Sequence, residues 1–163
     1  MSALDPDVFR QAMRRTASGV TVVTTDGDEG PLGVTVSSLC SLSLEPPSIL
    51  FCLHRESRLL PIVKANGVFA ANILADGQQR VADSFAGLIP ELREDRFAAG
   101  HWSTLVTGSA LLDGALCAFD CKLASIFEFG SHSIIAGEVL AAEMRGDKPL
   151  IYSGGDYRQL ETA

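Results

Sequence analysis

Serines are concentrated in one short segment that could hold a small anion. Four of seven consecutive positions are serine and two prolines follow shortly after: Ser37, Ser38, Ser41, Ser43, Pro46 and Pro47. Because strands favour β-branched residues, this run requires either local hydrogen bonding or a ligand. Serine hydroxyls and free backbone N–H groups can bind a phosphate without a lysine. The segment therefore indicates either a serine-capped strand end or an anion site.

The sequence lacks the common motifs of nucleotide-binding and metal-binding sites. It has neither G-x-G-x-x-G nor a P-loop lysine, and its glycines near residue 30 fall in an expected hairpin turn. No histidine has a second ligand at i+2 to i+5, and no C-x-x-C occurs, so no metal site is predicted. Cys117 and Cys121 lie four apart on an expected strand, which places them about 13 Å apart and favours buried thiols.

Aromatic and imidazole side chains near the second half of the chain have ordinary structural explanations. His132 follows Gly130 and Ser131, which fits a hydrogen-bonded turn histidine. Tyr152 and Tyr157 flank a Gly-Gly pair, which fits core packing beside a loop. From the residues alone, the prediction stops at a β-rich domain with a possible small-anion site.

Composition excludes several classes of protein. The 163 residues carry 20 Asp plus Glu against 13 Lys plus Arg, with no block of five like charges, so nucleic acid is an unexpected partner. No run approaches the roughly 18 to 20 apolar residues that a membrane span requires, and no secretory leader is recognisable. We expect a soluble, cytoplasmic protein.

Periodicity and turn residues give the elements that must position these groups. Helices are expected from Asp5 to about Ala17, from Arg58 to Ala65 and from Gln78 to Ala86. Strands are expected at Val20–Thr25, Leu32–Ser38, Ser48–Leu53, Val68–Leu74, Leu105–Leu112, Ala115–Phe127 and Ser133–Met144, with a polar loop from Pro90 to Gly100. Because strands and helices do not alternate regularly, this pattern predicts an antiparallel barrel or sandwich with peripheral helices.

Several segments in this order resemble the short-chain flavin reductases of two-component monooxygenase systems. The matching segments are Phe9 to Thr24, the serine run through Glu45-Pro46-Pro47, Asn72, Phe85, Arg96-Phe97, Gly130-Ser131-His132, and Gly154-Gly155-Asp156-Tyr157. The resemblance implies a mainly β fold, an antiparallel six- to seven-stranded Greek-key split barrel with peripheral helices, forming a single FMN-binding domain over residues 1–163.

The resemblance also implies where the ligands bind. The implied flavin-binding residues are Thr35, Val36, Ser37, Ser38, Cys52, Leu53, Ser57, Arg58 and Phe85, with Ser57 and Arg58 on the phosphate. The implied nicotinamide-binding residues are His132, Tyr152 and Tyr157. No catalytic acid, base or nucleophile is expected, because hydride transfer between two cofactors depends mainly on their positions.

The implied activity is hydride transfer from NADH or NADPH to FMN or FAD by a homodimer, with reduced flavin supplied to a partner monooxygenase. The family's aspartate is replaced by Ser131, which leaves the choice of coenzyme open. A flavin carrier or storage module on the same fold is the principal alternative. An oxidase of the pyridoxamine-phosphate type is a third, but the sequence lacks the cluster of basic side chains that its substrate would need.

Overall fold

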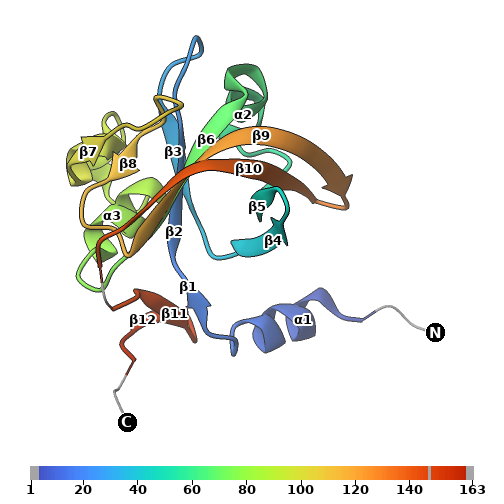
Figure 1. Cartoon of the computed structure of the whole chain (residues 1–163). Coiled ribbons are helices and arrows are strands. Elements are labelled where there is room, and N and C mark those ends of the chain that lie inside the picture. The colour runs from blue at the N-terminus through green and yellow to red at the C-terminus, as the bar shows by residue number, and fades with distance from the viewer. Residues whose placement is uncertain (1–3, 147, 161–163) are drawn as a thin grey trace.

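A seven-stranded antiparallel sheet forms the centre of the molecule (Figure 1). The computed structural model describes residues 4–146 and 148–160. In spatial order the strands are β3 (Leu32–Val36), β2 (Thr21–Thr25), β6 (Val68–Ile73), β9 (Cys117–Phe129), β10 (His132–Met144), β5 (Pro47–His54) and β4 (Cys40–Leu44). The predicted mainly β, antiparallel fold with peripheral helices is confirmed.

The sheet curls around one apolar core, so that its first strand, β3, comes next to β5. Phe51 and Phe69 meet edge to face in this core, with ring centroids 5.1 Å apart. Helix α2 (Leu59–Asn66) covers it with Leu59 and Val63 and ends where Gly67 adopts a left-handed φ of 68°. Burial of these apolar side chains drives the curvature that brings β3 and β5 together.

A second core lies under α3 (Gln79–Phe85). The ring of Phe85 packs against Phe97 and Trp102, with centroid distances of 5.0 and 5.5 Å. The segment predicted as a polar loop contains two short 3-10 helices, η1 (Pro90–Leu92) and η2 (Arg96–Ala99). The loop prediction therefore overlooked the element that carries Phe97 into the core.

The strand predicted at Leu105–Leu112 is mostly absent. Only Leu111–Leu112 is strand (β8), and it pairs with β7 (Trp102–Ser103). The backbone N–H groups of Val106 and Thr107 donate to the buried carboxylate of Asp120, at 2.7 and 2.9 Å. These donors are turned toward the carboxylate and form no ladder, which is why this segment does not extend the strand.

A strand was also missed at the serine run, where Cys40–Leu44 forms β4 and pairs with β5. The abundance of serine conceals this strand because serine has little preference for strands. Its pairing with β5 is what places Ser37 and Ser38 in the short connection between two strands.

The N-terminal helix is shorter than predicted and stands away from the barrel (Figure 1). Helix α1 (Pro6–Met13) begins at Asp5, whose carboxylate accepts the Asp7 N–H at 2.8 Å. The chain then enters β1 (Ser18–Gly19), which pairs with β11 (Ile151–Ser153) beside β12 (Asp156–Arg158). None of the α1 residues is buried. In the described part of the chain, no helix has the length and apolar character needed to cross a bilayer.

Candidate functional site

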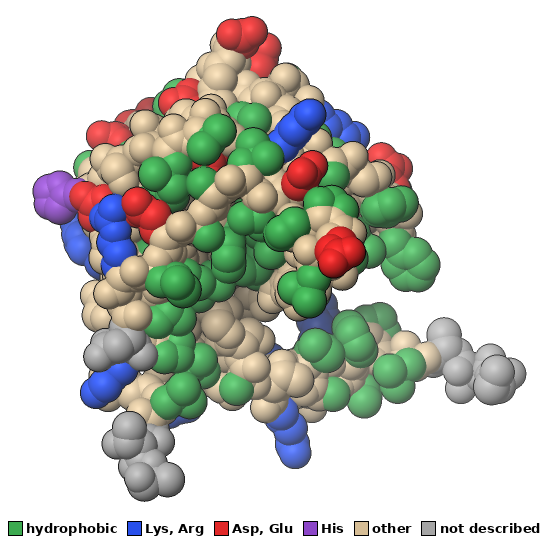
Figure 2. Space-filling view, in the orientation of Figure 1, with side chains coloured by type: hydrophobic (Ala, Val, Ile, Leu, Met, Phe, Trp, Pro, Cys, Tyr) green, Lys and Arg blue, Asp and Glu red, His purple; other side chains and the backbone are tan. Residues whose placement is uncertain are grey.

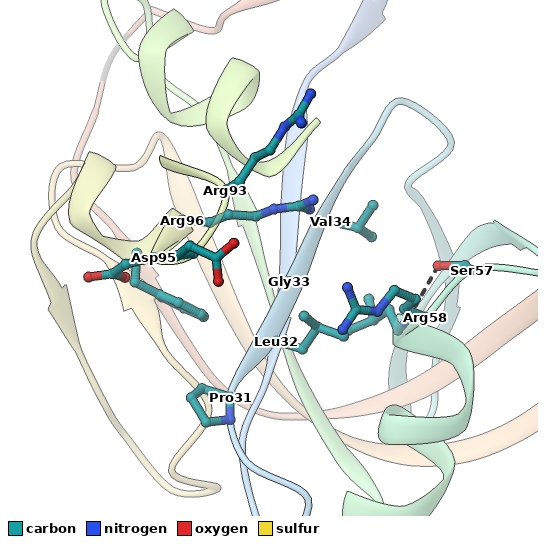
Figure 3. A pocket seen from close by; sticks show the side chains of 12 residues that line it. Pro31, Leu32, Gly33, Val34, Ser57, Arg58, Arg93, Asp95 and Arg96 are labelled. Atoms are coloured by element: carbon teal, nitrogen blue, oxygen red, sulfur yellow. Dashed lines mark hydrogen bonds between the residues drawn. The ribbon is translucent and has the colours of Figure 1, made fainter. Parts of the chain in front are cut away.

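Two adjoining clefts follow β3 along the side of the barrel. The serine cleft, about 380 Å³, is lined by Val34, Thr35, Val36, Ser37, Ser38, Cys52, Leu53, His54, Ser57 and His132. The arginine cleft, about 540 Å³, is lined by Pro31, Leu32, Gly33, Val34, Ser57, Arg58, Leu59, Arg93, Glu94, Asp95, Arg96 and Phe97 (Figure 3). Val34 and Ser57 line both, so the two clefts form one continuous surface.

The serine cleft lies where the sheet is open. Among the described strands, β3 pairs only with β2, so its other edge offers backbone N–H and C=O groups to a ligand. The Ser38 hydroxyl accepts the Cys52 N–H at 2.9 Å and donates to the Cys52 carbonyl at 3.3 Å, which ties the end of β3 to β5. The Thr35 hydroxyl donates to the Ala82 carbonyl at 2.6 Å. The Ser37 hydroxyl differs from those of Ser38 and Thr35, because it has no hydrogen-bond partner among the described residues.

Two histidines meet at the mouth of the serine cleft. Antiparallel pairing of β10 with β5 places His132 opposite His54, and their rings make an edge contact with centroids 5.2 Å apart. The His54 Nδ1 accepts the Glu56 N–H at 3.2 Å, and the Ser131 Oγ lies 2.9 Å from the His132 Nδ1. His54 was missed from the sequence, because only the strand register brings it to His132.

The arginine cleft begins at the N-terminus of α2. The Ser57 hydroxyl accepts the Leu59 N–H at 3.3 Å, and Arg58 follows it as the residue that precedes the helix. Figure 3 shows Arg58 extending toward Leu32 and Gly33 from one side of β3, while Arg96 extends toward Val34 from the other.

The opposite wall of this cleft comes from η2 and the residues before it. Arg96 donates to the Phe85 carbonyl at 3.1 Å, and the Asp95 carboxylate accepts the Ala98 N–H at 3.3 Å. Neither Arg93 nor Arg96 was predicted as a site residue, although Arg96-Phe97 is among the segments that match the family. Their segment was interpreted as a loop, and nothing in its spacing indicates that it folds against β3.

Eight of the nine implied flavin-binding residues line one or both clefts, and Phe85 lines neither. Phe85 is 0% exposed and packs behind β3, where a Cβ added at Gly33 would lie 2.6 Å from its ring. Tyr152 and Tyr157 also line neither cleft, because they belong to the separate β1-β11-β12 sheet. Within one chain, the structure therefore does not bring the two tyrosines to His132.

Tyr157 instead forms a hydrogen bond to a residue of α3. Its hydroxyl donates to the Asp83 carboxylate at 2.6 Å, and its ring lies 5.6 Å from that of Tyr152. Burial raises the pKa of Tyr157 above its ordinary value, and the bond to Asp83 adds to that rise. The hydroxyl therefore stays protonated and serves to hold β12 against α3.

The clefts are built to hold and orient bound molecules. The serine cleft combines apolar side chains with backbone hydrogen-bonding groups, as small-molecule sites do. The most buried thiol, Cys121, lies outside both clefts, and burial together with the neighbouring Asp120 raises its pKa to about 12. This thiol is therefore a poor nucleophile at neutral pH. The geometry favours chemistry that depends on positioning bound molecules.

Comparison with known proteins finds that this chain is similar to flavin reductases. The model of the flavin reductase like domain family matches residues 13–161. The chain is 43% identical over 156 residues to FMN reductase (NADH) RutF of Stutzerimonas stutzeri, covering 95% of this chain and 88% of the relative.

Solved structures of flavin reductases also resemble this chain. BorF, the flavin reductase component of a bacterial two-component tryptophan halogenase, is 34% identical with a TM-score of 0.85, covering 98% of this chain and 100% of BorF. The NADH:FAD oxidoreductase of Streptomyces globisporus, in complex with NAD and FAD fragments, is 30% identical with a TM-score of 0.87, covering 99% and 98%.

Proposed function

Because the chain belongs to the flavin reductase like domain family, we propose that it transfers a hydride from NADH to FMN. FAD and NADPH are the alternative ligands. The observation that carries the proposal is the continuous cleft along the open edge of β3, which combines an apolar site for a ring with a cationic site for a phosphate. Bound FMN would supply an electron-accepting ring for the hydride of NADH, with one proton taken from solvent.

The serine cleft provides what a flavin ring needs. Unpaired backbone groups near Val36 and Ser37 can contact the polar edge of the ring and stabilise the negative charge that reduction places there. Cys52 and Leu53 form the wall on the β5 side. At the end of the cleft, Ser57 and Arg58 would hold the phosphate through a hydroxyl and a charge-assisted hydrogen bond.

The remaining task of the protein is to hold the nicotinamide against the flavin ring. His132 stands at the mouth of the serine cleft, and we assign it to the coenzyme and not to proton transfer. Tyr152 and Tyr157 would contribute to the coenzyme site only across a subunit interface, since they line neither cleft of their own chain.

The decisive experiment mixes the purified protein with NADH and FMN and follows absorbance at 340 nm. A reductase oxidises NADH at a rate that saturates with FMN. A flavin carrier or storage module would bind FMN, seen as a change in flavin fluorescence, and leave the NADH absorbance unchanged. That second result would overturn the proposed activity.

We expect His132→Ala to raise the KM for NADH by about two- to tenfold, because one hydrogen bond of ordinary strength contributes about 0.5 to 1.5 kcal/mol. The Kd for FMN should change much less, since His132 stands at the mouth of the cleft. Steady-state kinetics and a fluorescence titration measure the two quantities. His101→Ala, an exposed histidine that lines neither cleft, is the control. If the two variants have the same KM for NADH, His132 has only a structural role in its turn.

We further propose that the protein is a cytoplasmic homodimer that supplies reduced flavin to a flavin-dependent monooxygenase. Support for the dimer comes from α1, where Val8, Phe9 and Met13 are each more than half exposed. Figure 2 shows hydrophobic side chains on α1 and on the facing part of the barrel, with an open hollow between them. A helix of 8 residues without buried contacts is marginal by itself, so a second copy packed against α1 would stabilise it.

We expect light scattering to give twice the 17.3 kDa chain mass, and Phe9→Asp to shift the protein toward the monomer. Phe9 is 56% exposed in one chain, so the substitution removes little intramolecular packing. Arg15→Ala, at an exposed position outside α1, lowers the net charge by the same one unit and is the control for the change in charge. A wild-type protein that is monomeric at micromolar concentration with FMN present would exclude the dimer.

A further inference from the structure

Two imidazoles meet at the mouth of the serine cleft. His54 ends β5 and lies opposite His132 at the start of β10, so their side chains project from the same face of the sheet. The ring centroids are 5.2 Å apart and the ring planes are inclined by 81°, which is an edge-to-face arrangement. Both residues are exposed, so this contact does not result from packing of the core.

The His54 ring is held by the turn that leads into α2. Its Nδ1 accepts the Glu56 N–H at 3.2 Å, and the His54 carbonyl accepts the Ser57 N–H at 2.9 Å. Because Nδ1 is an acceptor, the neutral ring carries its proton on Nε2. His54 therefore presents a hydrogen-bonded ring with a defined tautomer to its neighbour.

Arg55 joins the turn of His54 to the turn of His132. Its backbone N–H donates to the Ser131 carbonyl at 3.0 Å. Its guanidinium donates to the Gly130 carbonyl at 3.3 Å and pairs with the Glu128 carboxylate at 3.2 Å. These contacts attach the β9–β10 turn to the start of α2, so the two imidazoles stay within contact distance of each other.

His132 has fewer constraints of its own. Its Nδ1 lies 2.9 Å from the Oγ of the adjacent Ser131, and its Nε2 has no hydrogen-bond partner in the part of the chain that the structure describes. An exposed side chain loses rotational freedom when a ligand fixes it, and that loss weakens binding. A ring that already rests against His54 has less freedom to lose.

We propose that His54 is a positioning residue for the coenzyme, because it holds the His132 imidazole in the orientation in which its free nitrogen meets NADH. The inference rests on the proposed function, since it requires that His132 bind the coenzyme. His54 acts through His132 and contacts neither NADH nor FMN.

Three substitutions separate the ring of His54 from its hydrogen bond. His54→Ala removes both. His54→Asn removes the ring but keeps an oxygen that can accept the N–H two residues further on, as asparagine does in turns. His54→Phe keeps an aromatic ring and removes the acceptor. His101→Ala is the control, because His101 is exposed and lines neither cleft.

Steady-state kinetics should show a rise in the KM for NADH of about two- to tenfold in His54→Ala and His54→Asn, the range expected for one aromatic pair. The rise should not exceed that of His132→Ala. His54→Phe should stay close to wild type, as should His101→Ala. In all four variants kcat and the Kd for FMN should change little, because the contact acts only on the side chain that binds the coenzyme.

A double-mutant cycle tests whether His54 acts through His132. In a protein that already carries His132→Ala, His54→Ala should cause no further rise in the KM for NADH, because the ring it positions is absent. Two effects that simply multiply would show that the residues act independently and would overturn the proposal.

Nuclear magnetic resonance gives a second readout that does not need activity. The chain has three histidines, so its imidazole C–H resonances are few, and the signals missing from His132→Ala identify those of His132. His54→Ala should shift the His132 resonances because it removes the neighbouring ring, and His101→Ala should leave them in place. Unshifted His132 resonances in His54→Ala would overturn the proposal.

Two other kinetic results would also overturn it. If His54→Phe resembles His54→Ala while His54→Asn resembles wild type, the hydrogen bond to Glu56 matters and the ring does not. If the Kd for FMN rises and the KM for NADH does not, His54 contacts the flavin. Failure of the proposed function looks different, because the wild-type protein would then not oxidise NADH at all. Failure of the positioning role alone would leave an active wild type whose KM for NADH equals that of His54→Ala.

Discussion

Arg58→Ala is expected to raise the Kd for FMN about ten- to a hundredfold. A hydrogen bond to a charged group contributes about 1.5 to 3 kcal/mol, and each 1.4 kcal/mol corresponds to about a factor of ten. Arg58 stands at the start of α2, beside Ser57, where the serine and arginine clefts meet. No glycine-rich loop is present to bind a phosphate, so this charge carries much of the anion's binding. Fluorescence titration with FMN measures the effect.

Riboflavin separates a phosphate contact from a general structural role of Arg58. It has no phosphate, so its Kd should hardly change in Arg58→Ala. Arg55→Ala is the control variant, because Arg55 precedes the same helix but pairs with Glu128 and lines neither cleft. Titrations at two salt concentrations should show the difference between FMN and riboflavin shrink as salt screens the exposed charge. An Arg58→Ala protein that binds FMN as tightly as wild type would contradict the phosphate assignment.

Phe85→Ala is expected to lower the free energy of unfolding by about 3 to 5 kcal/mol, as large-to-small substitutions of buried aromatic residues do. The ring is 0% exposed and makes edge contacts with Phe97 and Trp102. It also supports Gly33 from behind, at the point where β3 forms the arginine cleft. Urea denaturation measures the loss, and Phe129→Ala, at a position 82% exposed, should change stability by less than about 0.5 kcal/mol.

Flavin titration of the same variants tests whether Phe85 contacts the flavin, as the family resemblance implied. Phe85→Leu keeps most of the apolar volume and should retain both stability and FMN affinity better than Phe85→Ala. A Phe85→Leu protein with wild-type stability but a strongly raised Kd for FMN would show that the ring contacts the flavin. Parallel losses of stability and affinity would support our view that Phe85 holds β3 in place.

Local patterns in the sequence were sufficient to predict most of the elements. Asp5 and Pro6 begin α1, the Asn-Gly pair at Asn66 and Gly67 ends α2, and β-branched residues mark β2. These signals depend on neighbours along the chain, so no tertiary information is needed to interpret them. The serines of the cleft and Arg58 were predicted as site residues on family resemblance, and the fold brings them to one surface.

The tertiary structure alone decided which distant groups meet. The register of β10 on β5 places His54 against His132, and the folding of residues 90–100 brings Arg93 and Arg96 to the cleft that Arg58 also lines. Strand register and loop docking depend on how the whole apolar core packs, and no single segment contains that information. For Phe85 the sequence and the tertiary structure each decided one property. Its place on a helix was clear from the spacing of apolar residues, but its complete burial depends on Phe97 and Trp102, which pack over its ring.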